Sequence, residues 1–165
     1  MPRCPQATTK EERTLTEGLI VVGVDSSEAS REALRWAIDE ARLREARLRV
    51  VHAWWVYPMG AADDPPDRAE RLLGTDPEVA VMEFVTETFG CGEPDVDVEI
   101  VPAQGRQASA ALIEAAKDAD LLVVGSRGAG GFTGLLLGSV SEQVTHHARC
   151  PVVIVKRSGS DTKQP

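Results

Sequence analysis

The sequence has few cysteines and no uninterrupted apolar run of membrane-spanning length. Its three cysteines, Cys4, Cys91 and Cys150, stand at unrelated spacings without a CxxC pair, so no disulfide framework is predicted. A reducing, cytoplasmic compartment is the simplest expectation. The first 16 residues lack the apolar centre of a signal peptide, and no segment approaches the length needed to cross a bilayer. We therefore expect no membrane partner.

Positive charge is also scarce. The 165 residues include 18 Lys and Arg against 26 Asp and Glu, which gives a formal net charge of −8. Non-specific nucleic-acid binding depends on basic surfaces that contact phosphate, so this balance argues against a nucleic-acid partner. The arginines between residues 31 and 49 alternate with acidic residues and are interpreted as a solvated helix face.

What the sequence does contain is an alternation of short apolar runs and helical patterns. Strands are predicted at 19–24, 48–56, 96–101, 121–124 and 151–155. Helices are predicted at 27–46, 76–89, 106–119 and 139–148. Apolar strands separated by helices are typical of a parallel sheet that is covered on both faces. The predicted fold class is therefore α/β, with a five-stranded parallel sheet of the Rossmann-like kind.

The two ends of the chain differ from its middle. Residues 1–17 are polar, contain two prolines and show no periodicity, and the tail 158–165 is similar. We interpret both as flexible and residues 18–157 as one domain. In open parallel sheets ligands bind beyond the carboxyl ends of the strands, where the strand order reverses. The informative positions are then Asp25, the main chain around His52 and Ala53, and the stretch from Gly125.

That stretch is rich in glycine. Five glycines fall between Gly125 and Gly134, and Gly138 precedes Ser139 at the start of the last predicted helix. Glycine permits positive φ and lets main-chain amides approach a bulky group closely. Free amides beside a helix amino end form an anion-binding concavity, to which Ser139 adds a hydroxyl donor. The pattern predicts a polyphosphate site; a loop whose glycines only make tight turns is the alternative.

Two familiar nucleotide motifs are excluded in this loop. A Walker loop needs GxxxxGK[ST], and no lysine lies between Lys117 and Lys156. The GxGxxG fingerprint fails because Thr133 stands where its third glycine is required.

Several fragments, in order, carry a family resemblance. The spacing G-2x-G-9x-G-[S/T] is met by glycines 125, 128 and 138 with Ser139. It accompanies VGVDSS at 22–27, VHA at 51–53, ADLLVVGSRG at 119–128, GSVS at 138–141 and CPVVIV at 150–155. Together they resemble the ATP-binding branch of the universal stress protein family.

The resemblance implies a site for ATP, together with Mg²⁺, and no resident metal site. Asp25 would accept hydrogen bonds from the ribose or lie near the base, and the main chain of Ala53 would bind the adenine edge. The loop and the amide of Val140 would hold the phosphates, with Arg127 adding a charge-assisted contact. The implied residues are Gly23, Asp25, Ala53, Gly125, Ser126, Arg127, Gly128, Gly130, Gly131, Gly138, Ser139 and Val140. The resemblance also implies a homodimer through the last strand, from Pro151 to Val155.

Other interpretations compete at two places. Asp25 and Glu28 could form a capping pair for the first helix, although Ser26 or Ser27 could cap it instead. His146 and His147 are interpreted as an exposed helix end that complements the helix dipole, because adjacent histidines diverge by about 100° and are poorly placed for zinc.

No residue can be assigned a catalytic role. No general base or water-positioning group accompanies the loop, and binding alone does not make an enzyme. The sequence therefore favours a nucleotide-binding sensor or regulator of the stress response, with at most slow ATP hydrolysis. The alternatives are an ATPase or nucleotidyl-transfer enzyme on the same fold and an interaction module that binds no nucleotide.

Overall fold

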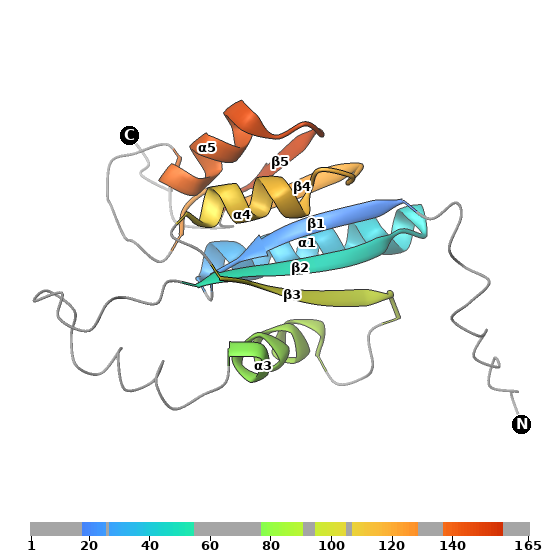
Figure 1. Cartoon of the computed structure of the whole chain (residues 1–165). Helices are drawn as coiled ribbons and strands as arrows, with labels where there is room; N and C mark the ends of the chain where they lie inside the picture. Colours follow the sequence, from blue (N-terminus) through green and yellow to red (C-terminus); the bar gives the residue numbers. More distant parts are fainter. Residues whose placement is uncertain are drawn as a thin grey trace, which may run out of the picture.

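The computed structural model describes residues 18–25, 27–54, 77–90, 95–104, 107–128 and 137–156, which form a parallel five-stranded sheet with helices on both faces (Figure 1). The strands are β1 Leu19–Val24, β2 Arg47–Trp54, β3 Val98–Gln104, β4 Leu121–Gly125 and β5 Val152–Val155. The helices are α1 Glu28–Arg44, α3 Pro77–Phe89, α4 Ala108–Ala115 and α5 Ser139–His147. The predicted fold class is confirmed.

The strand order β3-β2-β1-β4-β5 places the reversal between β1 and β4. The chain moves outward from β1 to β3 and then crosses back to β4, which pairs with β1 in the register Val22↔Val123. The carboxyl ends of β1 and β4 therefore lie side by side. Asp25 leaves one of these strands and Ser126 leaves the other, which places both at the switch point where such sheets bind ligands.

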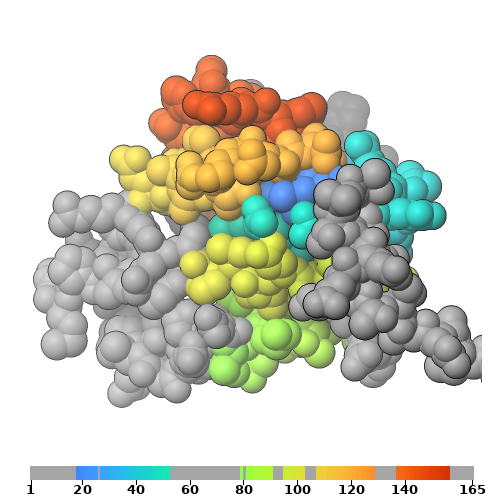
Figure 2. All heavy atoms as spheres, turned by 45° about the vertical axis from the view of Figure 1, so that its right-hand side comes forward, coloured from blue at the N-terminus to red at the C-terminus, as the bar shows by residue number. Residues whose placement is uncertain are grey.

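Two apolar cores hold the helices on the sheet. The core beneath α1 and α3 includes Ile20, Leu34 and Phe84, and the core beneath α4 and α5 includes Val21 and Leu112. Successive residues of β1 alternate between the cores, so the central strand is buried on both faces and little of its blue surface is visible in Figure 2. None of the described helices combines the length and apolarity needed to cross a membrane.

Several helix ends differ from their predicted positions. α1 stops at Arg44 rather than at 46, because Glu45 adopts a left-handed conformation (φ 54°) whose N–H bonds to the carbonyls of Ala41 and Arg42. α4 runs over Ala108–Ala115 instead of 106–119, and residues 116–118 form a turn in which the Lys117 N–H bonds to the Glu114 carbonyl. α5 ends at His147, one residue early.

The strand predictions need smaller corrections. β3 begins at Val98 and continues through Pro102 to Gln104, whereas the prediction covered 96–101. Proline is tolerated there because β3 is the outermost strand on its side, where an amide facing away from the sheet has no ladder partner. β2 begins one residue early, at Arg47, and β5 one residue late, at Val152. Residues 55 and 56 of the predicted second strand lie outside the described residues.

Candidate functional site

Asp25 belongs to a hydrogen-bonded turn at the start of α1. Its Oδ1 accepts hydrogen bonds from the N–H of Ser27 at 3.1 Å and from the Ser27 hydroxyl at 2.5 Å. Ser27 Oγ in turn accepts from the Ser30 N–H at 3.2 Å, which makes Ser27 the N-cap. The capping pair of Asp25 with Glu28 is therefore wrong, because Ser27 caps the helix and leaves Asp25 beyond its end.

The Asp25 carboxylate lies against the glycine loop. A Cβ built on Gly128 would stand 2.5 Å from Asp25 Oδ2, so only glycine fits beside this carboxylate as it is placed. Close approach, rather than positive φ, is the reason for glycine here. Among the described glycines only Gly90 has a positive φ, so glycines 125, 128 and 138 do not use that conformational freedom.

At Gly125 and Gly23, glycine is required because a side chain would collide with neighbouring elements. A Cβ on Gly125 would lie 2.8 Å from the main-chain carbon and oxygen of Ala29, so the missing side chain lets α1 rest on β4. The Gly125 carbonyl also accepts a 2.6 Å hydrogen bond from the buried hydroxyl of Ser141, which ties α5 to the same strand. A Cβ on Gly23 would meet the Leu112 side chain of α4 at 2.9 Å. Both glycines shape the floor of the site from within the sheet.

Two loop amides that were expected to face a ligand are bonded within the protein. The Ser126 N–H donates to the Val155 carbonyl at 2.8 Å, and the Gly138 N–H donates to the Ser126 carbonyl at 2.8 Å. The prediction of an unbroken row of free amides is wrong at these two positions. The second bond has another consequence: it closes the base of the loop and brings Gly138 beside Arg127.

The amino end of α5 is open at this place. Its N-cap is Gly138, which makes no side-chain capping bond, and the Glu142 N–H to Gly138 carbonyl bond, 2.9 Å, starts the helical ladder. The N–H groups of Ser139 and Val140 precede that bond and have no acceptor within the helix. Such groups, with the helix dipole, favour a negatively charged group.

His52 is a site feature that sequence reasoning named only for its main chain. It pairs in register with Val24, the residue before Asp25, and its side chain is half-buried. Burial lowers the pKa of His52, and the Asp25 carboxylate opposes that shift. Its buried Nδ1 has no hydrogen-bond partner, an arrangement that costs about 1–3 kcal/mol. The signal available in the sequence was a polar ring at the end of an apolar strand.

The structure brings together most of the predicted residues that it describes. Asp25, Gly128 and Gly138 meet at the tips of β1 and β4, with the exposed Arg127 beside them and α5 starting there. Ala53 is one strand away, where β2 pairs with β3 in the register Ala53↔Ala103. Gly130 and Gly131 lie outside the described residues.

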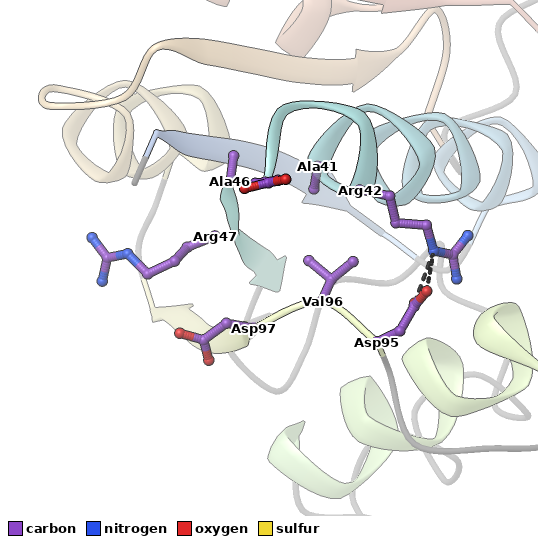
Figure 3. Close-up of a pocket in the computed structure, with 8 residues that line it drawn as sticks. Ala41, Arg42, Ala46, Arg47, Asp95, Val96 and Asp97 are labelled. Atoms are coloured by element: carbon purple, nitrogen blue, oxygen red, sulfur yellow. Dashed lines mark hydrogen bonds and ion pairs between the residues drawn. The ribbon is translucent and has the colours of Figure 1, made fainter. Parts of the chain in front are cut away.

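A hollow lies at the opposite edge of the sheet, at the amino ends of β2 and β3 (Figure 3). It is a shallow depression of about 120 Å³ between the end of α1 and residues 95–97. Arg42 and Asp95 line it and pair with each other, with Nε 2.8 and 2.9 Å from the two carboxylate oxygens. Because Arg42 and Asp95 neutralise each other and the hollow is remote from the strand tips, we assign it no ligand.

Comparisons with solved structures agree with this architecture. UspA from Lactobacillus plantarum superposes with a TM-score of 0.66 at 23% identity, covering 86% of this chain and 99% of that one. A universal stress protein solved in complex with cAMP gives 0.58 at 28% identity (86% and 98%). An Archaeoglobus fulgidus universal stress protein in complex with dAMP gives 0.56 at 25% identity (86% and 100%).

Sequence comparisons identify the family. Universal stress protein Rv2623 of Mycobacterium tuberculosis is 39% identical over 155 residues, which cover 88% of this chain and 50% of that protein. Mb2028c of Mycobacterium bovis is 38% identical over 142 residues, 84% of this chain and 45% of that protein. The chain thus spans about half the length of these relatives. The model of the universal stress protein family matches residues 18–156. The chain belongs to the universal stress protein family.

Proposed function

We propose that this protein binds an adenine nucleotide at the carboxyl ends of β1 and β4, with ATP and Mg²⁺ as the preferred pair. The observation that carries the proposal is the start of α5, which has no side-chain cap and lies beside Gly128, the glycine that contacts Asp25. An anion-favouring helix end next to a carboxylate suits a ligand with both phosphates and hydroxyl groups. Two relatives at 28% and 25% identity were solved with cAMP and dAMP, which supports the same ligand class here.

Each residue has a role in this proposal. The amides of Ser139 and Val140 would hold phosphate oxygens together with Gly128 and the loop glycines 130 and 131, and Arg127 would add a charge-assisted contact. Asp25 would accept hydrogen bonds from ribose hydroxyls, and the main chain of Ala53 would pair with the adenine edge. Gly23, Gly125, Ser126 and Gly138 would shape the floor on which these groups stand.

The carboxylate of Asp25 is the reason why we expect Mg²⁺ to bind together with ATP. A bare phosphate chain beside a carboxylate suffers like-charge repulsion. Mg²⁺ binds carboxylate and phosphate oxygens together with water, so it would offset the repulsion at this edge.

A titration tests the binding proposal. The protein, freed of co-purified nucleotide, is titrated with ATP and Mg²⁺, AMP and cyclic AMP by calorimetry. We expect micromolar to submillimolar dissociation constants, since the amides of Ser139 and Val140 and one carboxylate form a modest set of contacts, and about 1 mM corresponds to only about −4 kcal/mol. Failure of every one of these nucleotides to bind at millimolar concentration would remove the proposal and favour an interaction module.

The regulatory part of the proposal separates this protein from an enzyme. A sensor changes conformation or partner when its ligand binds, and needs no turnover. Incubation with ATP and Mg²⁺ should release phosphate far more slowly than about 1 s⁻¹, the lower end of ordinary enzyme rates. Faster steady turnover would support the ATPase or nucleotidyl-transfer alternative. We also propose that the protein acts in the cytoplasm.

We also propose a homodimer through β5, which is an outer strand of the sheet and carries four half-buried apolar side chains. The other outer strand, β3, carries Pro102 and Glu99, features that discourage pairing. The carbonyls of Pro151 and Val155 accept hydrogen bonds from Leu122 and Ser126, on the β4 side of the strand. Because successive residues alternate in direction, the Ile154 N–H points outward, away from β4.

Sedimentation should show a dimer at micromolar concentration and a folded monomer for Ile154→Pro. An unchanged dimer in that variant would place the interface elsewhere.

A further inference from the structure

The half-buried imidazole of His52 has a buried Nδ1 to which the proposed site assigns no role so far. In β2, Val50 belongs to the core beneath α1 and α3, and Val51 to the core beneath α4 and α5. His52 therefore lies on the α1 and α3 side, with Val24 as its register partner. Within the part of the chain that the structure describes, its Nδ1 is the one buried side-chain nitrogen or oxygen without a hydrogen-bond partner.

Among the described charged groups near His52, Asp25 is the one that influences the pKa of its imidazole. Burial lowers the pKa of the imidazole, and the Asp25 carboxylate is the charge that opposes this. On the facing helices, Arg31 of α1 pairs with Glu28 at 3.8 Å and with Glu87 of α3 at 3.4 Å, so these charges compensate one another. From β3 the register partner is Pro102, which carries no charge.

Asp25 follows the register partner of His52 in the chain and contacts the glycine loop. Ser27 holds its Oδ1 through two hydrogen bonds, and its Oδ2 faces Gly128 closely enough to exclude a Cβ. A neutral imidazole leaves this arrangement undisturbed. A protonated imidazole is a donor at both nitrogens, and a buried cation requires an anionic partner. The carboxylate that would pair with it is the one proposed to accept hydrogen bonds from the ligand.

We propose that protonation of His52 draws the Asp25 carboxylate out of the orientation that Ser27 sets, and thereby makes ligand binding at this edge depend on pH. With His52 neutral, Asp25 keeps the orientation that Ser27 sets and accepts hydrogen bonds from ligand hydroxyl groups. With His52 protonated, the carboxylate pairs with the imidazolium, and binding weakens. The inference rests on the proposed nucleotide site and names a regulation of that site.

Cyclic AMP is the probe for the binding test. Its phosphodiester keeps one charge across the range, whereas a terminal phosphate itself titrates near pH 6. The affinity of the wild-type protein should be about fivefold lower, the weak end of ordinary couplings, at about pH 5 than at about pH 7.5. His52→Gln, which is polar but does not titrate, should match the wild type at the higher pH and show little change. The same pH slope in both proteins would overturn the proposal.

A second measurement needs no ligand. The imidazole of His52 is titrated by NMR in the free wild-type protein and in Asp25→Asn. Since the Asp25 charge favours the protonated ring, the variant should show a lower pKa for His52. An unchanged pKa would overturn the coupling. Failure of cyclic AMP to bind at either pH would overturn the binding half of this inference. The titration with ATP and AMP decides the proposed nucleotide site separately, and the NMR titration decides the His52–Asp25 coupling by itself.

Discussion

Replacing Gly128 by alanine should lower the affinity for adenine nucleotides by about 100-fold, or about 2.7 kcal/mol, while the protein stays folded. The new Cβ would stand 2.5 Å from Asp25 Oδ2, so the carboxylate or the loop must move. Because Gly128 is exposed and follows β4, the movement does not reach either core. Calorimetric titration with AMP, alongside circular dichroism and thermal unfolding, measures both parts of the expectation.

Gly138→Ala is the matched control in the same loop. Its Cβ would find ordinary contacts, the nearest being Arg127 Cα at 3.4 Å, and its N–H to Ser126 carbonyl bond would remain. We expect a loss of affinity below about tenfold, or about 1.4 kcal/mol. Equal losses in the two variants would mean that reduced loop flexibility, and not displacement of Asp25, governs binding. Wild-type affinity in Gly128→Ala would place the ligand elsewhere.

The fold could be predicted because each element carries its own signal. The apolar run of β1 predicted a strand buried on both faces, and Ser27 was available to cap α1 from its position alone. Where boundaries moved, the cause lay in tertiary context. β3 continues through Pro102 because it is an outer strand, a position that a local pattern does not reveal.

The sequence predicted the location of the site better than the hydrogen bonding of its groups. The contact between Asp25 and Gly128 follows from the meeting of β1 and β4, which the ligand rule for such sheets anticipates. The Ser126 amide was misassigned because its acceptor, the Val155 carbonyl, comes from the partner strand and depends on register. The buried, unpaired state of His52 Nδ1 likewise depends on tertiary packing.

Gly125→Ala should be the most destabilising single-methyl addition in the sheet. Its Cβ would lie 2.8 Å from both the main-chain carbon and the oxygen of Ala29, and 3.1 Å from the Ala29 Cβ. A main chain cannot rotate out of the way as a side chain can, so α1 would have to lift from β4. Overpacking of this kind costs about 3 kcal/mol, which lowers the melting temperature of a domain of this size by about 6–12 °C.

Gly23→Ala separates this effect from a general cost of adding a methyl group to a central strand. Its Cβ would meet Leu112 Cδ2 at 2.9 Å and Cδ1 at 3.0 Å, the far end of a side chain that can change rotamer. We expect a loss of about 1 kcal/mol, measured as a shift of the urea midpoint at constant slope. If both variants lost the same free energy of unfolding, the Ala29 main chain would be able to move aside. The glycine at position 125 would then be required by the ligand rather than by the packing of α1 on β4.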